Sequence, residues 1–376
     1  MLNGDNPLLC FLMVLIRQGG TMNHSQKQGG VSMRKVEPKD WIPLIKPYAK
    51  PNTLRSLRQV ADTLLPLLLL FYLAHKALSV SLALTLLLDF AAALFLVRLF
   101  ILQHDAGHGS FFPRKWANDL LGFFTGVLTL VPYHHWQLSH ARHHATSGNL
   151  DKRGVGDIYT MTLEEYLKAS PWDRLKYRLY RNPFVMFFLG PIYVFMLSYR
   201  LPLGYGSDKP SVRNSVALTN LFLALLLAGI AVFFGVKTLL FVYLPIQYLA
   251  GMIGIFLFYV QHQFEDVYWE HDPRWEFLKA AMEGSTYLKL PRVLQWLTGN
   301  IGFHHIHHLA PKIPNYLLPK VQEEVDLVKV APTVTLKDAF KIAFADMHLH
   351  DEESRKLVGF KEAHQRLREA QGKKAY

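Results

Sequence analysis

The sequence is short of two things that most soluble proteins of its size use. Among 376 residues there is one cysteine, Cys10, so no disulfide can form within the chain, and cysteine-ligated zinc sites and iron–sulfur clusters are excluded. Charged residues make up only 19% of the chain, whereas apolar residues make up 51%. A lipid-facing surface needs no charge, so this composition favours an integral membrane protein. Metal ligands, if present, must come from the 18 histidines and the carboxylates.

The charged residues are mostly basic. Lysine and arginine exceed the acidic residues by enough to give a formal net charge of +12. Such a balance suits nucleic acid, an anionic membrane surface or an acidic protein partner. Because the same chain carries long apolar runs, we expect the membrane first, an acidic electron-carrier protein second, and no nucleic acid.

Four apolar runs are long enough to cross a bilayer, which takes about 20 helical residues. They occupy residues 60–80, 82–102, 214–234 and 238–258, and the short links between them predict two helical hairpins. Two further apolar stretches, 120–131 and 184–199, are shorter, and the second is expected to be interfacial or re-entrant rather than spanning. The predicted fold is an all-α integral membrane protein with about four transmembrane helices, interfacial helices and a cytosolic helical cap.

The basic residues predict an orientation. Lysine and arginine are frequent before the first run and again in residues 151–182, and cytoplasmic segments carry this excess. Because each helical hairpin crosses the membrane twice, the chain returns to the cytoplasm after each hairpin. We therefore expect an integral protein, most simply of a bacterial inner membrane, with its active site on the cytoplasmic side.

Three segments divide the chain. Residues 1–38 suggest a disordered leader, or residues ahead of a true start at Met22 or Met33. Residues 39–318 are predicted to form the membrane domain with the functional site. Residues 319–376 are charged and helical in pattern, at 321–328, 336–347 and 351–371, which predicts a cytosolic helical tail.

Histidines gather in three short motifs at the ends of apolar segments. The first has the pattern H-x3-H, and the other two share the pattern H-x2-H-H. On a helix, histidines three or four apart share a face, whereas adjacent histidines diverge by about 100°. A further histidine follows the last apolar run. The candidate metal ligands are His104, His108, His140, His143, His144, His262, His304, His307 and His308.

Nine imidazoles are too many for one ion, and they fit two ions with four or five ligands each. Imidazole suits zinc, copper, iron and nickel. A closed four-histidine zinc site would not need so many ligands. The ligand count does not exclude copper. Two redox metals close together can share the electrons that cleavage of O₂ requires.

Two acids and the remaining histidines carry weaker expectations. Asp105, beside His104, could orient a ligand imidazole from outside the coordination shell. Asp89 lies within the second span and is a candidate for a polar contact between helices. His305 is either a spacer or such an orienting residue. No metal role is expected for His24, His75, His134, His135, His271, His348, His350 and His364.

These three motifs resemble those of the membrane fatty acid desaturase family. The matching stretches are His104-Asp105-Ala106-Gly107-His108, His140-Ala141-Arg142-His143-His144 and His304-His305-Ile306-His307-His308. Flanking segments such as Asp157-Ile158-Tyr159-Thr160 and Gln261-His262-Gln263-Phe264-Glu265 are similar to those of bacterial acyl-lipid desaturases. The resemblance covers roughly Asp40 to Tyr316.

The resemblance implies a four-span bundle, two iron ions, O₂, a membrane-lipid acyl chain as substrate and a separate electron donor of the ferredoxin or cytochrome b5 type. No fused cytochrome b5 motif is present. His262 matches less securely than the other eight, because relatives that act on acyl-CoA carry an asparagine four residues earlier, where this chain has Phe258. Asn300 is a candidate to replace that group.

Other functions share parts of this pattern. A membrane di-iron lipid hydroxylase, ketolase or alkane monooxygenase would carry the same three motifs and would leave oxygen in its product. A histidine-rich metal transporter is the alternative from another class. Transporters place ligands near the bilayer midplane, whereas these motifs lie at the ends of the predicted spans.

Overall fold

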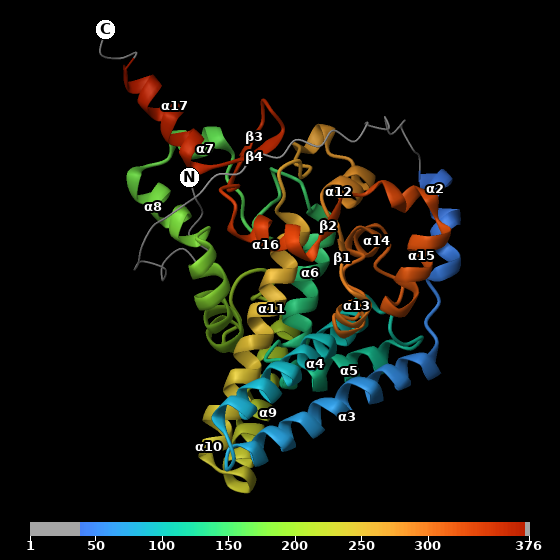
Figure 1. Ribbon diagram of the computed structural model, residues 1–376. Helices are drawn as coiled ribbons and strands as arrows, with labels where there is room; N and C mark the ends of the chain where they lie inside the picture. Colours follow the sequence, from blue (N-terminus) through green and yellow to red (C-terminus); the bar gives the residue numbers. More distant parts are fainter. Residues whose placement is uncertain (1–37, 373–376) are drawn as a thin grey trace.

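Four long helices form the lower part of the molecule (Figure 1). The computed structural model describes residues 38–372, so the expected leader, its alternative start sites, Cys10 and His24 lie outside the described residues. The first hairpin consists of α3 (Thr53–Ala77) and α4 (Leu82–His108). The second consists of α9 (Pro210–Phe234) and a continuous helical segment, Val236–His262, which comprises α10 (Val236–Thr238), the π-helical turn η5 (Leu239–Tyr243) and α11 (Leu244–His262).

These four helices are long and apolar enough to cross a membrane, which confirms the predicted count among the described residues. Two of them continue beyond the predicted apolar runs, so that α4 reaches His108 and α11 reaches His262. Gly109, with a φ of 64°, ends α4 in a left-handed conformation that glycine adopts without strain. The motif histidines therefore sit on rigid helix ends rather than on loops.

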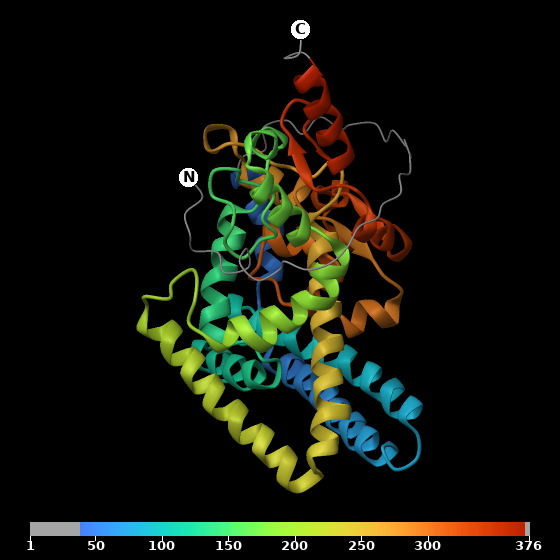
Figure 2. The same cartoon turned by 90° about the vertical axis from the view of Figure 1, so that its left-hand side faces the viewer.

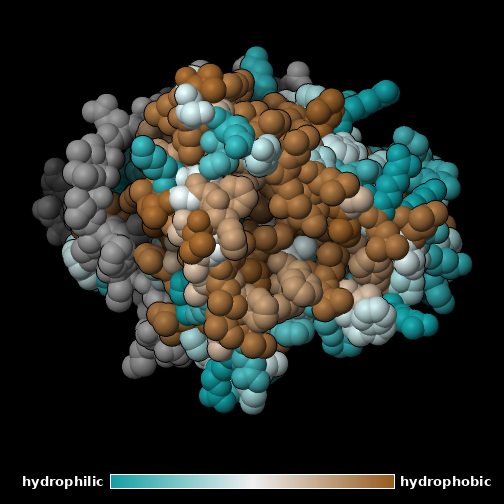
Figure 3. All heavy atoms as spheres, turned by 90° about the horizontal axis from the view of Figure 1, so that it is seen from below, coloured by the Kyte–Doolittle hydropathy of each residue, from teal (hydrophilic) through white to brown (hydrophobic). Residues whose placement is uncertain are grey.

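The outer faces of the hairpins are apolar. Leu65, Val232 and Phe233 are 65%, 77% and 82% exposed, which would be costly in water but suits hydrocarbon. Seen from below, hydrophobic side chains cover much of this end of the molecule (Figure 3). The chain is an integral membrane protein.

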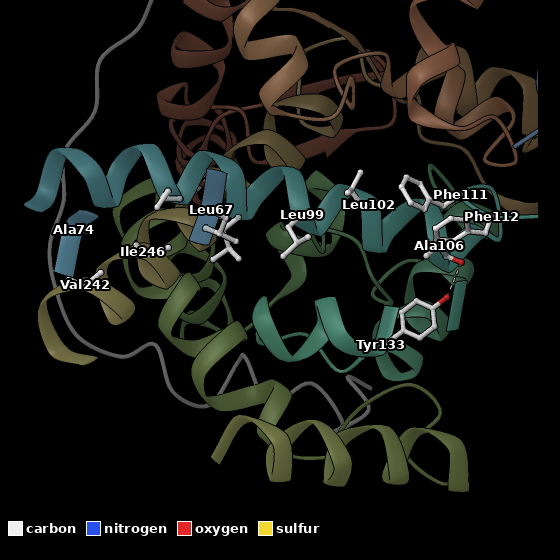
Figure 4. Packing of buried hydrophobic residues seen from close by; sticks show 13 residues of the cluster. Leu67, Ala74, Leu99, Leu102, Ala106, Phe111, Phe112, Tyr133, Val242 and Ile246 are labelled. Carbon is white, nitrogen blue, oxygen red and sulfur yellow. Dashed lines mark hydrogen bonds between the residues drawn. The ribbon is translucent and has the colours of Figure 1, made fainter. Parts of the chain in front are cut away.

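The inner faces of the hairpins pack into one apolar cluster. Leu67 of α3, Leu99 of α4 and Val242 of η5 belong to it, and small residues such as Ala74 let the helices approach closely (Figure 4). At its upper end, the Tyr133 hydroxyl donates a hydrogen bond of 2.9 Å to the Ala106 carbonyl oxygen. This contact fixes the last turn of α4 against α6, between two histidine motifs.

A bent segment crosses between the hairpins. It consists of α8 (Pro171–Tyr180), the π-helical turns η2 (Val185–Leu189) and η3 (Ile192–Leu197), and the 3-10 turn η4 (Ser198–Arg200), with a bend of 62°. The bend lies between Tyr180 and Val185, whereas Gly190 and Pro191 keep helical dihedral angles between the two π-helical turns. The geometry suits a broken span or a re-entrant loop, and the interfacial or re-entrant placement of this segment stays a prediction.

Short helices form a cap over the upper ends of the hairpins (Figures 1 and 2). They are α2 (Pro38–Ile45), η1 (Lys46–Tyr48), α6 (Tyr133–Thr146), α7 (Leu163–Lys168), η6 (Asp272–Arg274), α12 (Phe277–Glu283), α13 (Arg292–Leu297), α14 (His304–Leu309), η7 (Asn315–Leu317), α15 (Leu318–Glu324), η8 (Asp326–Val330), α16 (Leu336–Phe344) and α17 (Phe360–Gly372). The helix α5 (Lys115–Leu128) lies lower (Figure 1) and packs against α4 and α9 of the hairpins. The fold is mostly helical, as predicted.

Two small sheets depart from the purely helical prediction. Strand β1 (Tyr287–Lys289) pairs in parallel with β2 (Thr333–Thr335), and β3 (Leu349–Asp351) pairs antiparallel with β4 (Lys356–Val358). The helix predicted over 351–371 is therefore wrong in its first part and begins at Phe360. The backbone N–H of His350 donates to the Met161 carbonyl and that of Leu357 to the Glu265 carbonyl, so pairing with loops of the cap overrides the local helical pattern.

The tail packs directly on the histidine region. The helix predicted over 321–328 ends at Glu324, and η8 follows it. Val321 and Val328 belong to the same buried apolar cluster as Ile306 and Leu309 of α14. The predicted boundary between residues 318 and 319 falls within α15, and the division into domains stays a prediction.

Candidate metal centre and adjoining cavity

Four helices bring the nine predicted histidines to one place. His104 and His108 occupy the last turns of α4, and His262 is the last residue of α11. The other six lie on α6 and α14, namely His140, His143, His144, His304, His307 and His308. The cluster lies at the end of both hairpins that is remote from their turns, so distant parts of the sequence converge.

The rings form two groups. In the first group, nitrogen atoms of five histidines lie within 4.8 Å of one another; its members are His104, His108, His140, His144 and His307. In the second group, His143, His262 and His308 meet the same limit. His304 adjoins the second group, because its Nε2 lies 2.8 Å from Nε2 of His262.

Adjacent histidines separate into different groups, as their divergence on a helix predicts. His143 faces the second group and His144 the first. The groups touch where the rings of His144 and His308 stack, with centroids 4.3 Å apart. Five rings on one side and four on the other correspond to the predicted arrangement of two ions with four or five ligands each.

The donor atoms suit transition-metal binding. Nε2 of His144 lies 3.1 Å from Nε2 of His140 and 2.9 Å from Nε2 of His307. Metal–imidazole bonds of about 2.0–2.1 Å at right angles place neighbouring nitrogens about 3 Å apart. Both ring nitrogens of His143 and Nε2 of His108 are buried without a hydrogen-bond partner in the structure. Such orphaned nitrogens are what a metal ion would satisfy.

Burial also keeps these rings in the form that binds metals. Desolvation, helped by the neighbouring rings, holds the pKa values of the α6 and α14 histidines of the cluster well below the ordinary value of histidine. The rings are therefore neutral near pH 7, and each keeps a lone pair for coordination.

Close packing holds the rings in position. The Trp136 ring stacks on His140 with centroids 4.5 Å apart and an interplanar angle of 18°. This approach depends on Gly107, where a Cβ atom would lie 2.7 Å from the Trp136 ring. Nδ1 of His262 lies 3.0 Å from the Gly284 carbonyl, a contact that orients the ring and leaves Nε2 facing the cluster.

Asp105 has a different role from the one predicted. Its Oδ2 accepts hydrogen bonds from the backbone N–H and the side-chain amide of Asn315, at 2.7 and 2.9 Å. Its closest approach to a candidate ligand is 3.5 Å, to Nδ1 of His104, and that nitrogen has no hydrogen bond. Asp105 therefore ties the first motif to the chain that follows the third motif, instead of orienting an imidazole.

His305 points away from the cluster. Its Nε2 lies 3.0 Å from Oε1 of Gln322 in α15, and the side chain is fully buried. The other described histidines also lie outside both groups. His75 contacts Thr238, His135 contacts the Leu203 carbonyl, and His271 bridges Asp151 and Glu352. The same holds for His134, His348, His350 and His364.

Phe258 lies beside the cluster where relatives acting on acyl-CoA carry asparagine. Its ring centroid is 5.3 Å from His143 and 5.2 Å from His262. The side-chain amide of Asn300 donates to the Asn315 carbonyl at 3.1 Å, which engages that group away from the rings. Asp89 is fully buried in α4 and neither carboxylate oxygen has a partner in the structure, so the expected polar contact between helices is not formed.

An apolar cavity of about 400 Å³ ends at the histidines. His104, His140 and His304 line its upper end, and Gln247 lines its other end. Gln247 and Gln261, the first and last lining residues on α11, are fourteen positions apart, so at about 1.5 Å per residue the cavity extends about 20 Å into the bundle. Most of the lining is aliphatic or aromatic. A long, narrow hydrocarbon fits this space.

Comparison with known proteins agrees with this geometry. A model of the fatty acid desaturase family matches residues 79–330. A fatty acid desaturase of Bacillus subtilis (strain 168) is 50% identical over 315 residues, which are 84% of this chain and 88% of the relative. The chain belongs to the fatty acid desaturase family. It is therefore an oxidoreductase that acts on an acyl substrate and uses O₂.

More distant relatives match this desaturase over a shorter region. The sn-1 acyl-lipid omega-3 desaturase (ferredoxin) of a Nostoc species is 31% identical over 239 residues, 60% of this chain and 63% of the relative. The sn-1 oleoyl-lipid 12-desaturase of a Synechocystis species is 28% identical over 225 residues, 58% of this chain and 62% of the relative. The matched region thus covers less than two thirds of each cyanobacterial relative.

The sequence predicts no role for two residues at the site, Trp136 and Asp157, although Asp157 lies in a flanking segment that resembles the family. Trp136 and Asp157 both line the cavity. Asp157 is the single carboxylate of that lining, and its pKa is raised by burial to about 6. The available signal for Asp157 was a carboxylate between two glycines and an apolar residue, in the segment Gly154 to Ile158 that follows the second histidine motif.

Proposed function

We propose that this desaturase introduces a cis double bond into the acyl chain of a membrane lipid, with two non-haem iron ions held by the nine histidines. The observation that carries the proposal is the apolar cavity, which lies within the bundle and ends at His104, His140 and His304. A hydrocarbon in this cavity would present one C–C bond to the histidine cluster while the rest of the chain lies in the bilayer portion of the fold.

The residues of this chain position the acyl chain and exclude water from it. Apolar lining from α4 and α11 excludes water from the methylenes, and burial of the methylenes binds the acyl chain at about 0.8 kcal/mol per CH₂. The five-histidine group and the four-histidine group would each hold one ion. When bound, two irons would supply the O₂ activation needed to remove hydrogen from an unactivated methylene.

The bent segment between the hairpins favours a substrate that arrives from the bilayer. Its π-helical turns contribute Met186 and Tyr193 to the cavity lining, while Phe184 and Leu189 are exposed on the outer side at 64% and 46%. One layer of helix therefore separates the cavity from surrounding lipid. A lipid-linked acyl chain can reach the cavity here without leaving the membrane.

Electrons would come from a separate protein, a ferredoxin or cytochrome b5 type carrier. Ferredoxin appears in the name of the Nostoc relative. The exposed Lys312 lies on the surface next to the centre, and its Nζ lies 2.5 Å from the carbonyl oxygen of His108. A cation at this point would attract an acidic carrier toward the metal ligand.

The distribution of basic residues supports an active site on the cytoplasmic side. Lys76 and Lys237 lie at the turns of the two hairpins, whereas lysines and arginines are frequent in the loops at the histidine end. Cytoplasmic loops carry such an excess.

Expression in a host that contains only saturated and monounsaturated lipids tests the function. We expect new double bonds, located by mass spectrometry, to appear first in intact membrane lipids, and none with His143→Ala. Oxygenated acyl chains without new double bonds would identify a hydroxylase instead. Double bonds that appear first in acyl-CoA would overturn the lipid-linked substrate.

A further inference from the structure

Desaturation needs protons and produces water, and the apolar cavity suits neither. As two C–H bonds break and the C=C bond forms, O₂ takes up the two hydrogens removed, two electrons from the carrier and two protons from solvent, and leaves as two water molecules. Protons and water need polar partners along their path. The inference that follows rests on the function proposed above.

A second, small pocket lies on another side of the histidine cluster. Its volume is about 10 Å³, the space that a single water molecule needs. His143 and His262 of the four-histidine group line it. Asp157, Ile158 and Phe258 line both this pocket and the apolar cavity, so they form the wall between the two spaces.

One residue of the pocket lining carries an unsatisfied hydrogen-bond donor. Trp269 lines it, is 8% exposed, and its indole Nε1 has no hydrogen-bond partner in the structure. A buried N–H without a partner costs about 1–3 kcal/mol, which a bound water would recover. Asp157 adds a carboxylate acceptor to the same lining.

The pocket also adjoins solvent. Asp157 and Tyr268 of its lining are partly exposed, and Glu265 and Asp266, shortly before Tyr268 in the chain, are exposed. The loop that carries Asp157 is held against α6 by Gly156, which has a φ of +72°. A Cβ atom there would lie 2.7 Å from the Ser139 carbonyl oxygen. The carboxylate is therefore fixed near the histidines by backbone packing.

We propose that this pocket is a water port. It binds a water molecule between the Trp269 indole N–H and the Asp157 carboxylate, and this water connects the four-histidine group with solvent on the side away from the acyl cavity. Protons enter and product water leaves through this port, while the wall of Ile158 and Phe258 keeps the acyl chain dry.

Two variants of the purified, iron-loaded desaturase with its electron carrier test the port. Trp269→Phe removes the donor and keeps an aromatic side chain, and Val267→Leu adds a methylene to the lining without removing a polar group. We expect either change to slow double-bond formation about tenfold, less than the roughly 100-fold that a positioned proton-transfer group contributes, because water retains partial access. The ratio of rates in H₂O and D₂O should rise, because proton supply becomes limiting.

Trp172→Phe is the control, since Trp172 lies on α8, is 50% exposed and lines neither the port nor the acyl cavity. It should keep the wild-type rate and isotope effect. Wild-type values for both Trp269→Phe and Val267→Leu would overturn the port while leaving the desaturase function intact. A slower Trp269→Phe enzyme whose isotope effect is unchanged would also overturn it, because a merely structural defect has that result. Failure of the wild-type enzyme to form double bonds would instead refute the proposed function.

Discussion

A larger side chain at position Gly254 should weaken binding of long acyl chains without unfolding the enzyme. Gly254 lines the cavity, and a Cβ atom built there meets no other atom within 4 Å. Gly254 lies seven residues from Gln247 on α11, so at about 1.5 Å per residue about 10 Å of cavity lies beyond it. A leucine at this position would occupy the space through which the acyl chain passes.

The expected loss follows from displaced methylenes. If three CH₂ groups lose their burial at about 0.8 kcal/mol each, binding weakens by about 2.4 kcal/mol. At about 1.4 kcal/mol per tenfold change, this is about 50-fold in affinity. We therefore expect Gly254→Leu to raise KM for long acyl chains by about that factor and to shift preference toward shorter chains.

Gly229→Leu is the matched control. Gly229 lies in the spanning helix α9, also has nothing within 4 Å of a built Cβ atom, and does not line the cavity. Lipids from cells that express each variant would be analysed by mass spectrometry beside thermal unfolding of the purified proteins. Wild-type activity and chain-length preference in a folded Gly254→Leu enzyme would refute the assignment of this cavity to the acyl chain.

Further predictions follow from the histidines and their supports. His262→Ala should lose iron and activity. His305→Ala should keep iron and lose about 1–3 kcal/mol of stability, because a fully buried ring and its hydrogen bond to the partly buried Gln322 are removed. Loss of iron from the His305 variant alone would reverse these roles. Asp105→Asn should lower the free energy of unfolding by about 1.5–3 kcal/mol, the usual strength of hydrogen bonds to a charged group. The measurement is the unfolding temperature, and Asp119→Asn, which changes a surface carboxylate, is the control. Hydrogen bonds to Asp151 and Glu352 raise the pKa of His271, so its stabilising contribution is complete below about pH 6.5 and is lost as pH rises through the raised value. The unfolding temperature of the wild type should therefore fall more steeply over that range than that of His271→Gln, and parallel curves would contradict this.

The spans and the histidines could be predicted because each depends on local pattern. Apolar runs of about 20 residues identify α3, α4, α9 and α11, since lipid imposes the same requirement on every residue of a span. Neighbouring side chains diverge on a helix, which correctly predicts that His143 and His144 face different groups. The extension of α4 to His108 follows from the same helical periodicity.

Other features depend on contacts between distant segments and leave no local pattern. The strands β3 and β4 form because their backbones pair with Met161 and Glu265. Asp105 stands beside His104 in the sequence, but its partner, Asn315, lies 210 positions away. Both cavities likewise arise where several helices meet, so neither the volume of the acyl cavity nor the unpartnered indole of Trp269 could be read from the chain.

The central claim is that nine imidazoles hold two iron ions beside an acyl cavity. The most direct test is the metal content of the purified full-length protein, measured together with its double-bond-forming activity. The account predicts two irons per chain, with loss of iron and activity in His143→Ala and His144→Ala, one ligand from each group. Full activity in a preparation without iron, or with one iron per chain, would contradict it.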